Sequence, residues 1–413
     1  MGTNLQIAWR FIVSRKRSMA MTLVGIVFGI AFFIVAQAQT TGFAKFFERT
    51  IIGTNGAIRI SDRYQTMGII TADNEGEERF DLQKTVGARY VEGIDYPKRL
   101  REAILPFDEV TGISEIFEGR AALDTGLRSH SAQAMGIRLQ DHLAVSDLGE
   151  QIVFGSLQDF GADRSGILLG HRLAERLNLH PGDMVNLMRS GESLRLRVSA
   201  IFETGVSQID KGRVYLDLAT ARAFFHKPAG GAIFQIGVRD PAQAPQIAAQ
   251  MQAAIEHRVV SWQEREKVWL DVFKVLRISS AVTVSTIILL SGLGMFNVFA
   301  LMVIEKTRDI AILRSMGFTR ADVSRIFLLQ GGIVLFSGAL LGSVFGALAT
   351  YGVSKVPLRI RGVFSTDHFV VNWDASHYGW AIGIAVVIMA VASWIPARRA
   401  ARVEPAKIIR EAT

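Results

Sequence analysis

Four long stretches without Asp, Glu, Lys or Arg constrain this 413-residue chain more than any other feature. Each has at least 23 residues, whereas an α-helix needs about 20 apolar residues to cross the hydrocarbon core of a bilayer. The helices of soluble proteins normally keep a charged face, which these stretches lack. We therefore predict transmembrane helices at Ser18–Ala44, Ile278–Ile304, Ile326–Ser354 and Ala375–Ala397.

The first stretch has an alternative interpretation as a cleaved signal peptide. Three basic residues, 15–17, precede it, and Ala36-Gln37-Ala38 fits a small-residue cleavage site. However, the apolar run is longer than that of a usual signal peptide, and the apolar residues within 5–12 share one helical face. We predict that the span is retained and that residues 1–17 form an amphipathic segment on the membrane surface.

The charge distribution predicts the orientation. Residues 1–17, 305–325 and 398–413 carry net charges of +4, +2 and +3, whereas residues 45–277 carry −2 and residues 355–374 carry +1. An excess of Lys and Arg marks short cytoplasmic segments. We expect both termini and the middle loop to be cytoplasmic and the other two segments to lie outside. The overall charge of +8 is then a topology signal, and nucleic-acid binding is not needed to explain it.

The outer segment, residues 45–277, predicts an α+β domain. Alternating apolar runs indicate strands at Ala57–Ser61, Leu194–Phe202, Val214–Leu216 and Ile233–Val238. Helical patterns cover His171–Leu179, Asp217–Phe225, which has an Asp cap, and Ala242–His257. Residues 62–95 indicate a loop or insertion. The domain has no disulfide, because the chain has no cysteine.

One helix is predicted to continue from the outer domain into the second span, over 262–304. An apolar face runs along its first part, and such a helix would join the domain rigidly to the membrane. Its predicted force-transmitting residues are Trp262, Trp269, Val272, Phe273 and Leu276.

Catalytic and ligand-binding motifs are missing from the sequence. No Gly-Lys dipeptide occurs, which excludes a P-loop, and the histidines form neither H-E-x-x-H nor a close pair. The spans contain no ionisable Asp, Glu, Lys or Arg that could serve as a proton or ion relay. We expect a chain without enzymatic activity, metal or cofactor of its own.

Small residues recur at four-residue spacing in two spans. Such a pattern lets two helices pack closely together, either within one chain or between two chains. The predicted helix-packing residues are Gly25, Gly29, Gly338, Gly342 and Gly346.

The loop between the second and third spans predicts a short amphipathic helix. Ile310 and Leu313 lie on one face, Gly317 is a plausible terminator, and Thr319 with Asp322 forms a capping box for the next helix. Such a helix either rests on the lipid surface or docks into a groove of a cytoplasmic partner.

This loop resembles a family signature. FNVFALMVIEKTRDIAILRSMGFTR (296–320) and SWIPARRAARVEPAKIIRE (393–411) are similar to the FtsX-like permeases of ABC transporters. The runs 42–61, 165–187 and 200–225 resemble the lipoprotein-releasing (Lol-type) permeases.

The resemblance implies a MacB-like periplasmic core domain and a multi-pass protein of the bacterial inner membrane. It implies a second permease, as homodimer or heterodimer, and separate ATPase subunits that bind ATP and Mg²⁺. A periplasmic carrier or adaptor is a further partner. Movements driven by ATP would pass through the loop and the second helix to the outer domains, which is mechanotransmission. The ATPase-coupling residues would be Glu305, Lys306, Arg308, Asp309, Ile310, Leu313, Arg314, Met316 and Gly317.

Three functions are compatible with this resemblance. The first is extraction of lipoproteins or other lipophilic substrates from the inner membrane. The second is export with a periplasmic adaptor. The third is signalling of the cell-division type, in which a cell-wall hydrolase is activated without transport. The 233-residue outer segment favours transport.

Overall fold

The computed structural model describes residues 3–14, 16–63, 93–94, 96–227, 232–357 and 368–402. The chain forms two compact units. We call the first the helical unit, which comprises Met1–Lys45, Asp271–Leu358 and Asp367–Thr413. The second, the α+β unit, comprises the described residues of Phe46–Leu270. The loop predicted at 62–95 lies almost wholly outside the described residues, and so does the end of the cytoplasmic tail.

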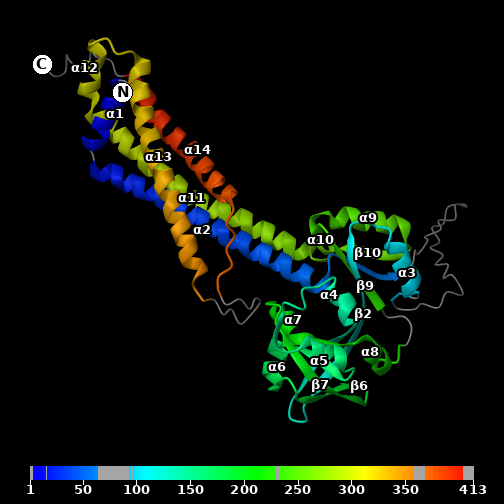
Figure 1. The fold of residues 1–413 in the computed structure, drawn as a ribbon. Coiled ribbons are helices and arrows are strands. Elements are labelled where there is room, and N and C mark those ends of the chain that lie inside the picture. The colour runs from blue at the N-terminus through cyan, green and yellow to red at the C-terminus, as the bar shows by residue number, and fades with distance from the viewer. Residues whose placement is uncertain are drawn as a thin grey trace, which may run out of the picture. The chain divides into compact units, whose positions relative to one another are not determined.

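Long apolar helices build the helical unit (Figure 1). Four of them are long and apolar enough to cross a membrane, as the charge-free stretches predicted. Helices α2 and α11 also contribute residues to the α+β unit. The helices are α1 (Thr3–Ser14), α2 (Lys16–Asn55), α11 (Lys267–Glu305), α12 (Thr307–Ser315), α13 (Arg320–Ser354) and α14 (Ala375–Ala401).

Within the described residues, the α+β unit contains one mixed sheet in the order β10-β1-β9-β2-β3-β8-β5-β7-β4, with β6 paired to β2 and β7. The pairs β3–β8 and β5–β7 are parallel and the other pairs are antiparallel. The strands are β1 (Ile58–Arg63), β2 (Val110–Asp124), β3 (Ser129–Ile137), β4 (Ile152–Gly155), β5 (Gly166–Gly170), β6 (Met184–Arg189), β7 (Glu192–Phe202), β8 (Arg213–Asp217), β9 (Ala232–Val238) and β10 (His257–Ser261).

Short helices cover this sheet. Ile247 and Met251 of α9 are buried with residues of β1, β9 and β10, and Leu173 of α6 and Ala221 of α8 join a second core. The helices are α3 (Pro97–Ile104), α4 (Leu139–Leu143), α5 (Leu157–Ala162), α6 (His171–Leu177), α7 (Ser207–Gly212), α8 (Leu218–Phe224), the 3₁₀ helix η1 (Pro241–Gln243), α9 (Ala244–Ala254) and α10 (Trp262–Arg265).

Local sequence signals explain several of these boundaries. Asp217 caps α8, because its Oδ2 accepts hydrogen bonds from the backbone N–H groups of Ala219 and Thr220 at 3.0 and 3.2 Å. The predicted Asp cap is therefore confirmed. The strands predicted in this unit correspond to β1, β7, β8 and β9, so the α+β class predicted from the sequence is confirmed.

The prediction of one unbroken helix over 262–304 is wrong at its start. The chain forms the single-turn helix α10, leaves helical geometry at Glu266 (φ −99°, ψ 17°), and begins α11 at Lys267. The cause is tertiary packing. Trp262 is buried and its indole N–H donates to the carbonyl oxygen of Pro241 at 2.9 Å, which holds the first turn against η1. The periodic apolar face predicts helix, but it does not reveal this local anchor.

Candidate functional site

Helix α12 is the part of the predicted coupling loop that carries the candidate site. Lys306 alone separates it from α11, and Gly317, in the left-handed region at φ +98°, follows its end. The hydroxyl of Thr319 accepts from the backbone N–H of Asp322, whose carboxylate accepts from the backbone N–H of Thr319, so the predicted capping box is confirmed. These signals hold α12 as a separate short helix between α11 and α13.

The face of α12 that carries Ile310 is covered by its own chain. Ile310 and Ala311 are each only 1% exposed, and Ile310 belongs to the hydrophobic core of the helical unit. The prediction that Ile310 offers an exposed docking surface is therefore wrong. The side chain instead anchors α12 to α11 and α13, because the core around it includes Met302, Val303 and Val323.

A different face of α12 is exposed. Ile312 and Met316 lie one turn apart and are 48% and 73% exposed, and Arg308 and Ser315 flank them. We call these four residues the exposed face of α12. Among the predicted coupling residues, Glu305 and Gly317 are also exposed, whereas Asp309, Leu313 and Arg314 are half-buried. An apolar pair rimmed by a cation is suited to a groove in a protein partner.

Helix α1 braces this region, which the sequence did not predict. The ring of Phe11 packs near the ring of Phe327 of α13, with ring centres 6.5 Å apart. The ammonium of Lys306 lies 5.6 Å from the Phe11 ring centre. The Nε2 of Gln330, a buried residue of α13, donates to the carbonyl oxygen of Ala8 at 3.3 Å. The signal that could have revealed this contact is the single amide side chain of the third span, since a buried amide requires a partner.

Lys306, between α11 and α12, pairs with an acidic residue in the first turn of α12. Its Nζ forms an ion pair with Asp309 Oδ2 at 2.8 Å. Both side chains are partly exposed, so this pair contributes at most about 1 kcal/mol of stability.

The five glycines predicted to pack helices lie against other helices of the same chain. A Cβ atom added to Gly338, Gly342 or Gly346 of α13 would lie within 2.9 Å of Ile26, Ile30 or Ile34 of α2, respectively. On α2, Gly25 and Gly29 face Ser291 and Ile288 of α11 in the same way. Helix α2 therefore packs closely against both α11 and α13.

The predicted force-transmitting residues differ in their surroundings. Trp262 lies in α10 and is buried, whereas Trp269, Val272 and Leu276 lie in α11 and are exposed. Trp269 contacts the Phe47 ring of α2, with ring centres 5.5 Å apart. The predicted five residues therefore do not form one buried face.

Among the buried ionisable groups of the α+β unit, His142 and Asp210 have shifted pKa values. Burial, and next the charge of Arg213, lower the pKa of His142 to about 3, and its Nδ1 lies 3.2 Å from the Ser114 hydroxyl. Burial raises the pKa of Asp210, whose Oδ1 accepts from the backbone N–H and the hydroxyl of Thr204 at 2.9 and 2.8 Å. In the part of the chain that the structure describes, no three His, Asp or Glu side chains group as metal ligands.

Family models match both parts of the chain. The model of the MacB-like periplasmic core domain matches residues 19–254, and that of the FtsX-like permease C-terminal region matches residues 281–405. The chain therefore belongs to the FtsX-like permeases with a MacB-like periplasmic core domain, and it is an ABC transporter permease of that type.

Named relatives match nearly the whole chain. The lipoprotein-releasing system transmembrane protein LolC of Xylella fastidiosa (strain Temecula1) is 23% identical, over 98% of this chain and 98% of its own. The corresponding LolE protein of Haemophilus influenzae is 22% identical, over 99% of each chain. Among solved structures, the periplasmic region of MacB from Actinobacillus actinomycetemcomitans matches with 13% identity and a TM-score of 0.33, covering 54% of this chain and 97% of that one.

Proposed function

We propose that this permease extracts lipoproteins, or other lipophilic substrates, from the bacterial inner membrane. The observation that carries the proposal is the similarity to LolC and LolE over nearly the full length, because those relatives are named as transmembrane proteins of lipoprotein-releasing systems. The charge-free spans support it, since they offer no relay for ion-driven transport.

ATP hydrolysis takes place in a separate cytoplasmic subunit that holds ATP and Mg²⁺. Its proposed docking site is the exposed face of α12, with Ile312 and Met316 as apolar anchors. Because Ile310 fixes α12 to the core of the helical unit, a push on α12 would move α11 and α13 as well. Helix α11 then carries the movement toward the α+β unit, and a second permease, identical or related, completes the transporter.

The proposed orientation places both termini and residues 305–325 in the cytoplasm and the α+β unit in the periplasm. The support is the excess of basic residues in residues 1–17, 305–325 and 398–413. Ser131 and Ser315 are both exposed, and the chain has no native cysteine. In intact spheroplasts, Ser131→Cys should therefore react with a membrane-impermeant maleimide, and Ser315→Cys should react only after lysis. The reverse pattern would overturn the orientation.

Depletion of the chain in its native host tests the function. We expect acylated lipoproteins bound for the outer membrane to accumulate in the inner-membrane fraction, while soluble periplasmic proteins are unaffected. A periplasmic carrier or adaptor should co-purify with the chain. If lipoproteins were sorted normally, the proposal would be wrong. Loss of export of a small lipophilic compound would then indicate an adaptor-dependent exporter, and loss of cell-wall hydrolase activity would indicate a signalling permease.

A further inference from the structure

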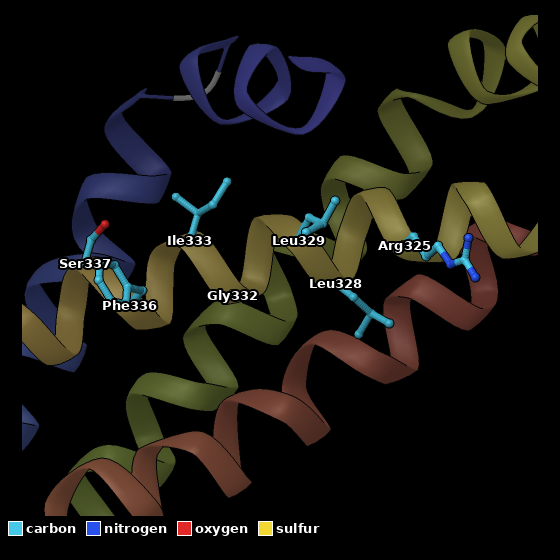
Figure 2. Close-up of a pocket in the computed structure, with 7 residues that line it drawn as sticks. All are labelled: Arg325, Leu328, Leu329, Gly332, Ile333, Phe336 and Ser337. Atoms are coloured by element: carbon cyan, nitrogen blue, oxygen red, sulfur yellow. The ribbon is translucent and has the colours of Figure 1, made fainter. Parts of the chain in front are cut away.

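A groove of about 530 Å³ runs along one face of α13 in the helical unit (Figure 2). Its lining residues recur at three- and four-residue spacing, which keeps them on one side of the helix. They include Arg325, Leu328, Leu329, Gly332, Ile333 and Phe336. The volume lies within the range of small-molecule binding sites in proteins.

Charge is confined to one end of this groove. Arg325 lies at one end, and Phe336 and Ser337 lie at the other (Figure 2). The side chain of Arg325 is 71% exposed, and its ion pair with Asp322 Oδ1 is long, at 3.9 Å. Asp322 is itself engaged by the capping box. The guanidinium is therefore available to an anion at the level where α13 begins.

The length of the groove corresponds to one leaflet of a bilayer. Phe336 lies eleven positions after Arg325, which amounts to about 17 Å along a helix. Half of the hydrocarbon core of a bilayer is about 15 Å. A phosphate beside Arg325 would therefore let an acyl chain follow the apolar lining toward Phe336.

Another protein helix fits this face less well. Close helix packing needs small residues at regular spacing, and the small-residue face of α13, formed by Gly338, Gly342 and Gly346, already packs on α2. The groove face carries large apolar side chains, of which Phe336 is 72% exposed. A flexible acyl chain can follow such an irregular surface.

We propose that the α13 groove binds one anionic phospholipid, with its phosphate at Arg325 and an acyl chain over Gly332. The inference does not depend on which substrate the permease transports. Since Arg325 lies six residues after Thr319, the N-cap of α13, the bound lipid would secure the end of α13 that follows α12.

Gly332 gives a sharp test. A Cβ atom added there meets nothing within 4 Å, and Gly332 lines the groove, so the side chain of Gly332→Leu should occupy it. Gly352, also on α13 and equally open, is the matched control. The probe is the full-length chain in detergent, titrated with phosphatidylglycerol or phosphatidylcholine and measured by native mass spectrometry.

We expect the wild-type chain to retain phosphatidylglycerol in preference to phosphatidylcholine. Arg325→Ala should lower the affinity for phosphatidylglycerol about fivefold, because one basic residue near anionic lipid contributes about 1 kcal/mol. Arg325→Lys should restore it, and phosphatidylcholine binding should not change in either variant. Gly332→Leu should remove the saturable binding of both lipids, whereas Gly352→Leu should leave it intact.

Equal retention of the two lipids by the wild type would overturn the proposal, as would unchanged binding in Arg325→Ala or in Gly332→Leu. A protein occupant has its own signature. Because the chain has no cysteine, a high yield of disulfide-linked dimer from Gly332→Cys in native membranes would assign the groove to a second copy instead.

Discussion

Replacing both apolar anchors of α12 by serine should detach the ATPase subunit. Ile312 and Met316 are 48% and 73% exposed in the free chain. Full burial of such a side chain contributes about 1.5–3 kcal/mol, so covering the exposed parts of both contributes roughly 2–3.5 kcal/mol. The Ile312→Ser/Met316→Ser variant should therefore bind the ATPase roughly 30- to 300-fold more weakly, since 1.4 kcal/mol is a factor of about ten.

The assay is affinity purification of the tagged permease at matched expression, followed by titration with purified ATPase subunit. Leu127→Ser is the control. Leu127 lies in the α+β unit and is 95% exposed, so this substitution also removes exposed apolar surface, but away from α12. We expect the double variant to fold, since neither side chain belongs to a core. Wild-type recovery of the ATPase with the double variant would refute the docking argument and favour a helix that rests on lipid.

Three further perturbations test other parts of the account. Gly342→Leu should lower the unfolding free energy by about 1–3 kcal/mol through overpacking against α2, whereas Gly352→Leu, which meets nothing within 4 Å, should leave thermal unfolding unchanged. Val272→Pro should break α11 at a cost of about 3 kcal/mol and abolish substrate release while the ATPase still binds. The control Lys267→Pro should be tolerated, because Lys267 is the first residue of the helix. Normal release by Val272→Pro would contradict force transmission through α11. Because the pKa of His142 is about 3 in the fold and about 6.5 when unfolded, the unfolded chain takes up the proton, so stability should fall by about 2 kcal/mol from pH 7.5 to 5.0. His142→Gln should flatten this dependence in unfolding measurements.

The spans and the local caps could be predicted from the sequence because their causes are local. A long run without charge is enough to indicate a membrane helix. The Asp217 cap and the Thr319 capping box each depend on residues at most three positions apart. Most of the described strand pairs join residues far apart in the sequence, so the class could be predicted but the strand order could not.

The face of α12 shows why the site was only partly predicted. Ile310 and Leu313 share one side of the helix by periodicity, but periodicity does not say which side the rest of the chain covers. The core of the helical unit covers Ile310 and leaves Ile312 and Met316 exposed. The break at Glu266 has a similar origin, because the indole of Trp262 is held by Pro241, more than 20 residues earlier.

Reconstitution tests the central claim most directly. The permease, its co-purified partner permease and the ATPase would be placed in proteoliposomes with a labelled triacylated lipoprotein, and transfer to a soluble acceptor would be followed over time. The account predicts transfer that requires ATP and that stops when the ATPase cannot hydrolyse it. Steady ATP turnover without any release of the lipoprotein, or release at the same rate without ATP, would contradict it.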